Sequence, residues 1–181
     1  MKNVVILNFS TRINGNCANI ANKIGVHHMQ TNVLYYVIDS RIGPCGNCDY
    51  ECLRPEEKCP NVTHYQCEVM EAVMNADITY MILPNYCGFP CANFLAFNER
   101  SVGYFNMNRL VMDRYMNARK RFIIISNSEN QMFDQAMRQQ VRTDPDVLYL
   151  KSSKYGKRSI AGDILESEAA LAELNVFLDK E

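Results

Sequence analysis

The sequence lacks three features that would point to a membrane or a nucleic acid. No apolar run approaches the roughly 20 residues that a membrane span requires. The formal net charge is only −1, so no excess of positive charge favours nucleic acid or an anionic membrane surface as a partner. The N-terminus also lacks a basic flank followed by a long apolar region, as a signal peptide would have. We therefore expect a cytoplasmic protein that binds neither membranes nor nucleic acid.

Two common nucleotide-binding motifs are missing as well. Without Gly-x-Gly-x-x-Gly, a dinucleotide-binding Rossmann loop is disfavoured, and without Gly-Lys-Ser/Thr the chain is not a P-loop NTPase. The remaining composition is that of an ordinary globular protein, with 48% hydrophobic and 22% charged residues. A length of 181 residues predicts one domain that spans residues 1–181.

Short apolar runs alternate with segments of helical periodicity along the chain. The runs that predict strands are Val4–Leu7, Val33–Ile38, Ile78–Leu83, Arg121–Ile125 and Val147–Leu150. The helices are expected at Asn16 to about Met29, Glu68 to Met74, Ala92 to about Met107, Met132 to Arg142 and Ile164 to Leu178. This alternation predicts an α/β fold with a five-stranded parallel sheet covered by helices on both faces.

Three polar turns follow the first, third and fourth predicted strands. They are Ser10–Asn16, Pro84–Gly88 and Ser126–Glu129, and a strand order of 2-1-3-4-5 would bring all three to one crevice. The first turn leads into a helix whose initial N–H groups have no partner, which makes it a natural site for a phosphate. The alternative is that Asn14 or Asn16 simply caps that helix.

A long irregular segment, residues 39–64, is rich in cysteine, glycine and proline. Four of the eight cysteines fall within it, at Cys45, Cys48, Cys52 and Cys59. Thiolates this close in sequence can hold tetrahedral zinc, with His64 or Cys67 replacing one ligand, or an iron–sulfur cluster. The alternatives are reduced, metal-free thiols or a disulfide formed on exposure to air.

Three motifs, taken in order, resemble those of the flavodoxin-like NAD(P)H-dependent FMN reductases, a family that includes the iron–sulfur flavoproteins. The family's first loop reads Gly-Ser-x-Arg-x-x-Gly-Asn-Thr, and here Ser10, Arg12, Gly15 and Asn16 match while Phe9 replaces glycine and Cys17 replaces threonine. The second loop, Pro-x-Tyr-x-Gly, is matched by Pro84, Tyr86 and Gly88. The third motif, Phe-x-Asp-Arg, corresponds to Phe97-Asn98-Glu99-Arg100, with glutamate in place of aspartate.

The resemblance implies a three-layer flavodoxin-like sandwich of strand order 2-1-3-4-5 and an oxidoreductase that binds FMN. NAD(P)H would be the electron donor, to the flavin or through it to an unknown acceptor, and no residue is assigned as a general acid or base. The residues that it places around FMN are Ser10, Arg12, Asn14, Gly15, Asn16, Cys17, Pro84, Asn85, Tyr86, Cys87, Gly88, Ser126, Asn127 and Ser128.

The family resemblance also leaves two rival functions open. One is an iron–sulfur flavoprotein in which a [4Fe–4S] cluster, bound by Cys45, Cys48, Cys52 and Cys59, exchanges electrons with FMN. The other is a scaffold that has lost flavin and acts as a binding or sensor protein, an idea that Phe9 supports. By resemblance we expect a homodimer or a higher homo-oligomer.

Several residues have plainer interpretations that the structure can check. Tyr86, taken alone, is expected to pack into the core at a strand end. Cys87 and Cys91 are expected as buried small hydrophobes. His27, His28 and the basic runs Arg119–Arg121 and Lys154–Arg158 are expected on the surface, although either basic run would suit a nicotinamide nucleotide phosphate.

Overall fold

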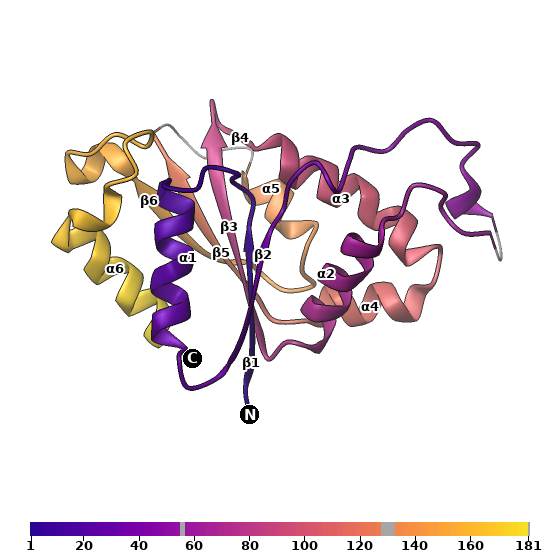
Figure 1. Cartoon of the computed structure of the whole chain (residues 1–181), viewed down its shortest axis with the longest axis horizontal. Coiled ribbons are helices and arrows are strands. Elements are labelled where there is room, and N and C mark those ends of the chain that lie inside the picture. Colours follow the sequence, from indigo (N-terminus) through magenta and orange to yellow (C-terminus); the bar gives the residue numbers. More distant parts are fainter. Residues whose placement is uncertain (55–56, 128–132, 181) are drawn as a thin grey trace.

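The computed structural model describes residues 1–54, 57–127 and 133–180. Its main sheet has the order β2-β1-β3-β5-β6, and every neighbouring pair in that order is parallel (Figure 1). The strands are β1 (Asn3–Asn8), β2 (Asn32–Val37), β3 (Ile78–Tyr86), β5 (Lys120–Ser126) and β6 (Asp146–Lys151). The predicted flavodoxin-like order is therefore confirmed, since β5 and β6 are the fourth and fifth long strands.

The burial of each strand follows its place in the sheet. Every residue of β5 is buried, as are the first six residues of β3, because helices cover both faces of these central strands. By contrast, β2 lies at the edge and has no fully buried residue. The unbroken apolar runs of the sequence thus become the centre of the sheet.

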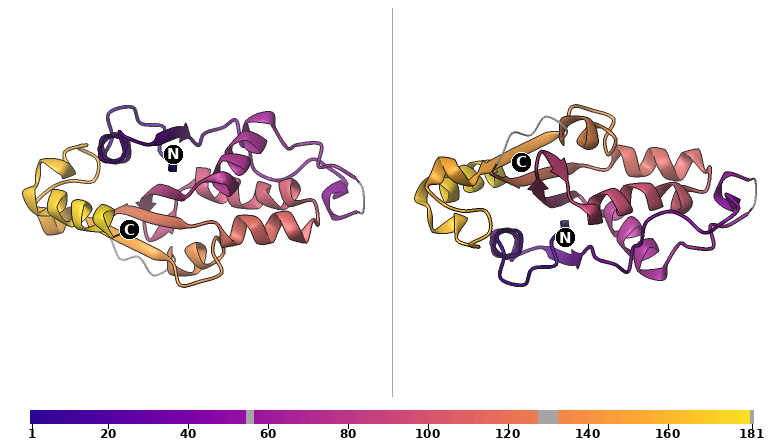
Figure 2. Two further views of the ribbon diagram at one scale, coloured as in Figure 1. Left: turned by 90° about the horizontal axis from the view of Figure 1, so that it is seen from below. Right: turned by 90° about the horizontal axis from the view of Figure 1, so that it is seen from above.

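Helices cover the sheet on both sides, as the two views of Figure 2 show. One face packs against α1 (Asn16–His27) and α6 (Glu168–Asp179), where Ile20, Ile24 and Leu174 are fully buried. The other face packs against α2 (His64–Asn75), α3 (Ala92–Phe105), α4 (Arg109–Asn117) and α5 (Phe133–Arg138). The three layers of the expected sandwich are therefore present.

Three predicted helices begin or end differently in the structure, and one of them is α2, which begins at His64 and not at Glu68. The segment predicted as one helix from Ile164 starts as a 3₁₀ turn, Ile164–Glu166, and α6 begins only after Ser167, whose side chain caps it by accepting from the Ala170 N–H. Within the described residues, α5 is shorter than predicted, and the Gln140 N–H bonds the carbonyl of Met137 to close a turn after it.

A short hairpin that the sequence did not predict extends β3 beyond Leu83. The two-residue strand β4 (Phe89–Pro90) pairs antiparallel with Asn85 and Tyr86. Its loop is Cys87-Gly88, with φ of +53° and +89°, so both central residues have the positive φ of a type I′ turn. The hairpin carries the predicted Pro84–Gly88 loop away from the sheet edge.

Three basic or histidine residues expected on the surface are buried. Arg121 is 0%, Lys120 4% and His28 4% exposed. The sheet register explains the burial of Arg121, because Arg121 lies opposite Tyr80 on the face that α6 covers. Its guanidinium stacks on Phe177, 3.8 Å from the ring centroid. His28 Nε2 lies 3.1 Å from the Tyr80 hydroxyl at the end of α1. The surface expectation was wrong for these three residues.

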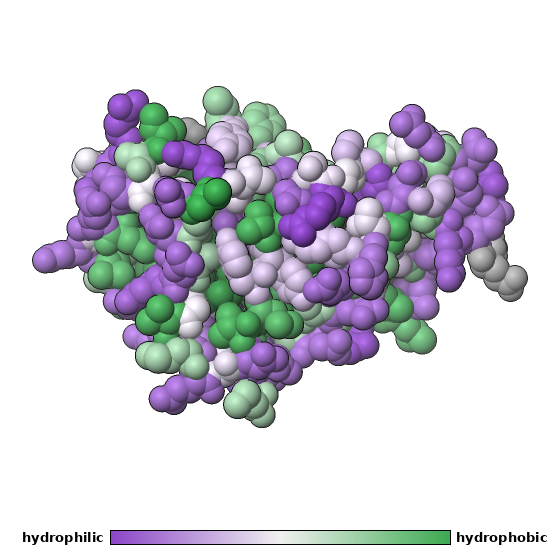
Figure 3. Space-filling model, in the orientation of Figure 1, coloured by the Kyte–Doolittle hydropathy of each residue, from purple (hydrophilic) through white to green (hydrophobic). Residues whose placement is uncertain are grey.

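The face shown in Figure 3 mixes hydrophilic and apolar patches. An apolar groove lies between α1 and the edge strand β2, and its lining includes Ile6, Val26, Met29 and Val33. No helix in the described part of the chain is both long enough and apolar enough to cross a membrane.

Candidate functional site

A cleft of about 320 Å³ opens at the carboxyl ends of the strands, where the expected crevice should lie. It joins the turns after β1, β3 and β5 with a segment after β6. Its lining consists of Ser10, Arg12, Gly15, Asn16, Cys17, Pro84, Asn85, Tyr86, Cys87, Ile125, Asn127, Ser159 and Ile160. The volume is that of a small-molecule site.

The first wall is the turn between β1 and α1. The Ser10 N–H donates to Asn8 Oδ1 at 2.9 Å, and the Ser10 Oγ accepts from the Arg12 N–H at 3.4 Å. These bonds fold the turn back over the end of β1, so that a hydroxyl, a guanidinium and the start of α1 all border the cleft. The wall therefore presents donors to whatever binds there.

The start of α1 differs from the starts of α2 and α4. Its N-cap is Gly15, which supplies no side-chain acceptor, whereas Thr63 caps α2 and Asn108 caps α4 through side-chain oxygens. Asn16 is instead the first helical residue, with its side chain turned to other partners. The interpretation of Asn14 or Asn16 as a simple cap was therefore wrong.

The second wall is the hairpin of β3 and β4. The two ends of the Asn85 amide are both engaged, since Nδ2 donates to Ser126 Oγ at 2.9 Å and Oδ1 accepts from the Gly88 N–H at 2.7 Å. This fixes the loop beside β5. Tyr86 at its tip is 58% exposed and lines the cleft, so the expectation that it packs into the core was wrong.

The third and fourth walls come from the segments after β5 and β6. Asn127 lines the cleft, whereas Ser126 is fully buried and acts through its bond to Asn85. The predicted ligand Ser128 lies outside the described residues. Ser159 and Ile160 also line the cleft but were not predicted. Their only sequence signal was that they follow the fifth strand, whose carboxyl end shares the same edge of the sheet.

Besides Ser126, two predicted ligands do not border the cleft. Asn14 is exposed and its backbone carbonyl contacts the segment after β6, while Gly88 shapes the hairpin turn behind Tyr86. The remaining described ligands of the prediction are brought together as expected, apart from the buried Ser126. Their contact with FMN stays a prediction.

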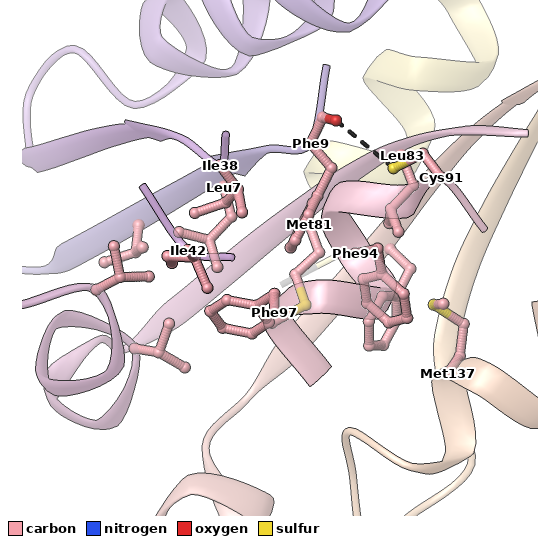
Figure 4. Packing of buried hydrophobic residues seen from close by; sticks show 14 of the residues in the cluster. Leu7, Phe9, Ile38, Ile42, Met81, Leu83, Cys91, Phe94, Phe97 and Met137 are labelled. Carbon is pink, nitrogen blue, oxygen red and sulfur yellow. Dashed lines mark hydrogen bonds between the residues drawn. The ribbon is translucent and has the colours of Figure 1, made fainter. Parts of the chain in front are cut away.

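Cysteine thiols lie on and behind the cleft wall. Burial raises the pKa of Cys17 to about 12 and that of Cys91 to about 11, so both remain thiols near neutral pH. The Cys91 Sγ donates to the Phe9 carbonyl at 3.5 Å, as Figure 4 shows. Cys87, by contrast, is exposed at the hairpin tip, which corrects the expectation that it is a buried hydrophobe.

The lining offers little for proton transfer. Among the described residues that border the cleft there is no carboxylate, histidine or lysine, and its one cationic side chain is Arg12. Such a lining can bind and orient an anionic, aromatic molecule. Any redox chemistry there would come from a bound cofactor.

The Cys45–Cys59 segment lies at the opposite end of the molecule from α1 and α6 in Figures 1 and 2, and none of its described residues lines the cleft. Arg100 of α3 is buried and donates to the carbonyls of Gly43 and Pro44, which come directly before the segment. Glu99 accepts from the Cys45 N–H at 3.3 Å. The Glu-Arg pair of the third motif therefore anchors this segment.

The four thiols of this segment lie near one another without forming a metal site. Burial raises the pKa of Cys52, and the neighbouring Cys59, Cys45 and Cys48 raise it further. Across residues 1–54, 57–127 and 133–180, however, no group of three or more His, Cys, Asp or Glu side chains is arranged to hold a metal ion. Binding of zinc or an iron–sulfur cluster by Cys45, Cys48, Cys52 and Cys59 stays a prediction.

Solved structures with similar folds come from several organisms. The Trp repressor binding protein from Bacillus subtilis is 14% identical, with a TM-score of 0.64 and 99% of each chain covered. An NADH:FMN oxidoreductase is 13% identical, with a TM-score of 0.57 over 99% of this chain and 87% of that one. The flavoenzyme NAD(P)H:(acceptor) oxidoreductase from Paracoccus denitrificans is 10% identical, with a TM-score of 0.53 over 99% and 96% of the two chains.

Such low identities establish a common fold and leave activity open. No protein-family model matches the sequence, and no curated protein matches it. The chemistry of the cleft must therefore carry the functional conclusion.

Proposed function

We propose that this chain is an FMN-binding oxidoreductase that accepts hydride from NAD(P)H and passes electrons to an acceptor. The observation that carries the proposal is the start of α1, which borders the cleft with Gly15 as its cap and no side-chain acceptor of its own. Unpaired N–H groups and the positive end of the helix dipole favour an anion at that position. A flavin phosphate is such an anion.

The donor set around that position suits a phosphate. The Ser10 hydroxyl and the Arg12 guanidinium border the same part of the cleft as the first turn of α1. Charge-assisted bonds to a phosphate are stronger than bonds between neutral groups. These residues would hold the phosphate, and no carboxylate among the described residues of the cleft lining would repel it.

The other half of the cleft suits an aromatic ring. Pro84, Tyr86 and Ile125 supply apolar surface, and the bond from Asn85 to Ser126 keeps the hairpin beside β5. In this role Tyr86 would pack against the ring, while the hairpin backbone would limit access of water. A bound flavin supplies the hydride and electron chemistry, so the protein's part is to bind it, orient it and control access to it.

The comparisons support the proposal without carrying it. The similar structures include an NADH:FMN oxidoreductase and a flavoenzyme NAD(P)H:(acceptor) oxidoreductase. The order of the three motifs, the convergence of the turns after β1, β3 and β5 on one cleft, and the names of these neighbours agree on the same chemistry. The iron–sulfur rival has no support from the arrangement of the four thiols.

Flavin binding tests the proposal directly. Titration of the purified protein with FMN and with riboflavin, followed by flavin fluorescence, should show tighter binding of FMN by about tenfold or more, because charge-assisted hydrogen bonds contribute about 1.5–3 kcal/mol. The variant Ser10→Ala should narrow that difference. Arg138→Ala, which changes an exposed arginine paired with Asp144 far from the cleft lining, is the control.

Three results would contradict the proposal. If the purified protein binds no FMN, the alternative of a scaffold without flavin would be favoured. Equal affinity for FMN and riboflavin would show that the start of α1 holds no phosphate. With FMN bound, anaerobic addition of NADH or NADPH should bleach the flavin absorbance, and failure with both donors would contradict the reductase activity.

A further inference from the structure

Residues 159–162, here called the strap, lie beside the first wall of the cleft. The strap follows β6 and a 3₁₀ turn, Ser152–Tyr155, and it precedes α6. Two of its residues, Ser159 and Ile160, line the cleft. It therefore forms part of the cleft wall.

Side chains of the first wall hold the strap by its backbone carbonyls. Arg12 Nη2 donates to the Ile160 carbonyl at 2.7 Å, and Asn16 Nδ2 donates to the Ser159 carbonyl at 2.9 Å. Asn19 Nδ2, on the next turn of α1, donates to the Gly162 carbonyl at 2.7 Å. Three donors on one turn and helix thus converge on one short segment.

The strap is also fixed to the third wall. Asn127 Nδ2 donates to Ser159 Oγ at 2.5 Å, and the Ser159 N–H donates to Asn127 Oδ1 at 3.3 Å. Just past the strap, the Ile164 N–H donates to Asn16 Oδ1 at 2.9 Å, so the buried Asn16 amide bonds at both ends. The strap therefore bridges the turns after β1 and β5.

No space remains between the strap and the first turn. Gly162 has φ of +82°, and a Cβ built on it would lie 2.5 Å from the Asn14 carbonyl oxygen. Only glycine combines that backbone conformation with so close an approach. Lys157 braces the segment from outside, pairing with Asp163 at 3.2 Å and Glu166 at 2.9 Å.

We infer that the strap sets flavin selectivity, so that the cleft accepts a flavin ending in a monophosphate and excludes FAD. This inference rests on the proposed function. The adenylate of FAD would extend the ligand beyond the phosphate position, toward Ser159 and Ile160, which line the cleft next to Arg12 and Asn16. The strap accepts hydrogen bonds from Arg12 and Asn16. Moving the strap aside to make room for the adenylate would therefore break those hydrogen bonds.

Two variants loosen the strap without changing a residue of the cleft lining. Gly162→Ala forces the strap away from Asn14, and Asn19→Ala removes one of its hydrogen bonds. Gly156→Ala is the matched control, because Gly156 also has a positive φ, of +65°, but has open space around its Cβ position and lies before the strap. Any effect of backbone strain alone appears in the control.

Dissociation constants for FMN and FAD, measured by fluorescence titration, provide the test. The unmodified protein should prefer FMN by about 100-fold or more, a preference of roughly 2.7 kcal/mol. Gly162→Ala and Asn19→Ala should narrow that ratio at least about fivefold, chiefly by strengthening FAD binding, while Gly156→Ala leaves it unchanged. Hydrogen exchange of the amides in residues 159–162 shows independently whether each variant has loosened the strap.

Each remaining result contradicts the inference. Equal binding of FMN and FAD by the unmodified protein would overturn the strap's role and leave the proposed function standing. A loosened strap, seen by hydrogen exchange, with an unchanged ratio would do the same. Binding of neither flavin would overturn the proposed function, and the inference with it.

Discussion

The ring of Phe9 meets the ring of Phe94 edge to face, with 5.3 Å between centroids and an interplanar angle of 71°. Phe97 makes a second such contact at 5.6 Å, and Figure 4 shows all three rings in the core between β1 and α3. Phe9 occupies the position of the glycine in the family's first loop. Because its side chain points into the core and does not line the cleft, it leaves the phosphate position clear.

Replacement of Phe9 should therefore affect stability more than ligand binding. Phe9→Ala removes a ring that is 1% exposed, and we expect it to lower the free energy of unfolding by about 3–5 kcal/mol. Phe9→Leu keeps most of the volume and should cost about 1 kcal/mol. Urea unfolding followed by circular dichroism measures both. An FMN affinity that falls at least tenfold in the folded Phe9→Leu protein would contradict this assignment.

The pair Arg121 and Asp146 predicts unequal effects of two substitutions. Arg121 Nε donates to Asp146 Oδ2 at 2.6 Å, while Nη1 and Nη2 are buried with no hydrogen-bond partner among the described residues. Asp146→Ala leaves the buried guanidinium without this partner and should cost about 1–3 kcal/mol. Arg121→Met removes the buried charge and keeps the contact with Phe177, so it should cost less than Asp146→Ala in urea unfolding. The reverse ranking would contradict this reasoning.

Lys120 should make stability depend on pH. Burial lowers its pKa from 10.5 to about 7, although Nζ donates to the carbonyls of Tyr115 and Ala118. Between pH 7 and the pKa of the unfolded chain, the unfolded state binds more protons than the native state. The contribution of Lys120 to stability therefore rises with pH across that window.

The variant Lys120→Met isolates this contribution. Cys17 and Cys91 act in the opposite direction, because their raised pKa values keep them protonated in the native state while the unfolded thiols ionise. Both thiols are present in either protein, so their effect cancels in the difference. The unfolding free energy of the unmodified protein relative to Lys120→Met should rise by about 1 kcal/mol per pH unit between pH 7 and 9.5. A flat difference would show that Lys120 keeps its ordinary pKa.

The thiols should differ in reactivity according to burial. Cys45 and Cys87 are exposed, while Cys17 and Cys91 are buried and have pKa values of about 12 and about 11. Brief alkylation with iodoacetamide at pH 8 should therefore modify the exposed pair first, since the thiolate is the reactive form. Peptide mass spectrometry reads the order. Early labelling of Cys17 would mean that the wall behind the cleft opens in solution.

The sequence by itself determined the architecture, because its signals are local. Unbroken apolar runs predicted the central strands, and the apolar stripe through Leu174 and Leu178 predicted the closing helix. Strand order then followed from resemblance, and the three polar turns were expected at one edge of the sheet. The structure confirms that convergence.

The tertiary structure alone decided which face each polar residue meets. Arg121 and His28 were expected on the surface because of their residue type. Arg121 is instead buried against α6, and His28 is buried against Tyr80. Tyr86, taken alone, was expected in the core, but the hairpin places it on the wall of the cleft. Side-chain type predicts an average environment, whereas register and helix placement fix the actual one.

The strap is the clearest case of a part of the site that local sequence patterns could not predict. Ser159 and Ile160 carry no local motif, and they become part of the site only because Arg12, Asn16 and Asn127 bond them from distant parts of the chain. Contacts between residues more than 140 positions apart cannot be read from periodicity or spacing, since these patterns report only neighbours along the chain. The sequence determined the strands, the helices and the cysteine spacing; folding brought the four walls of the cleft together.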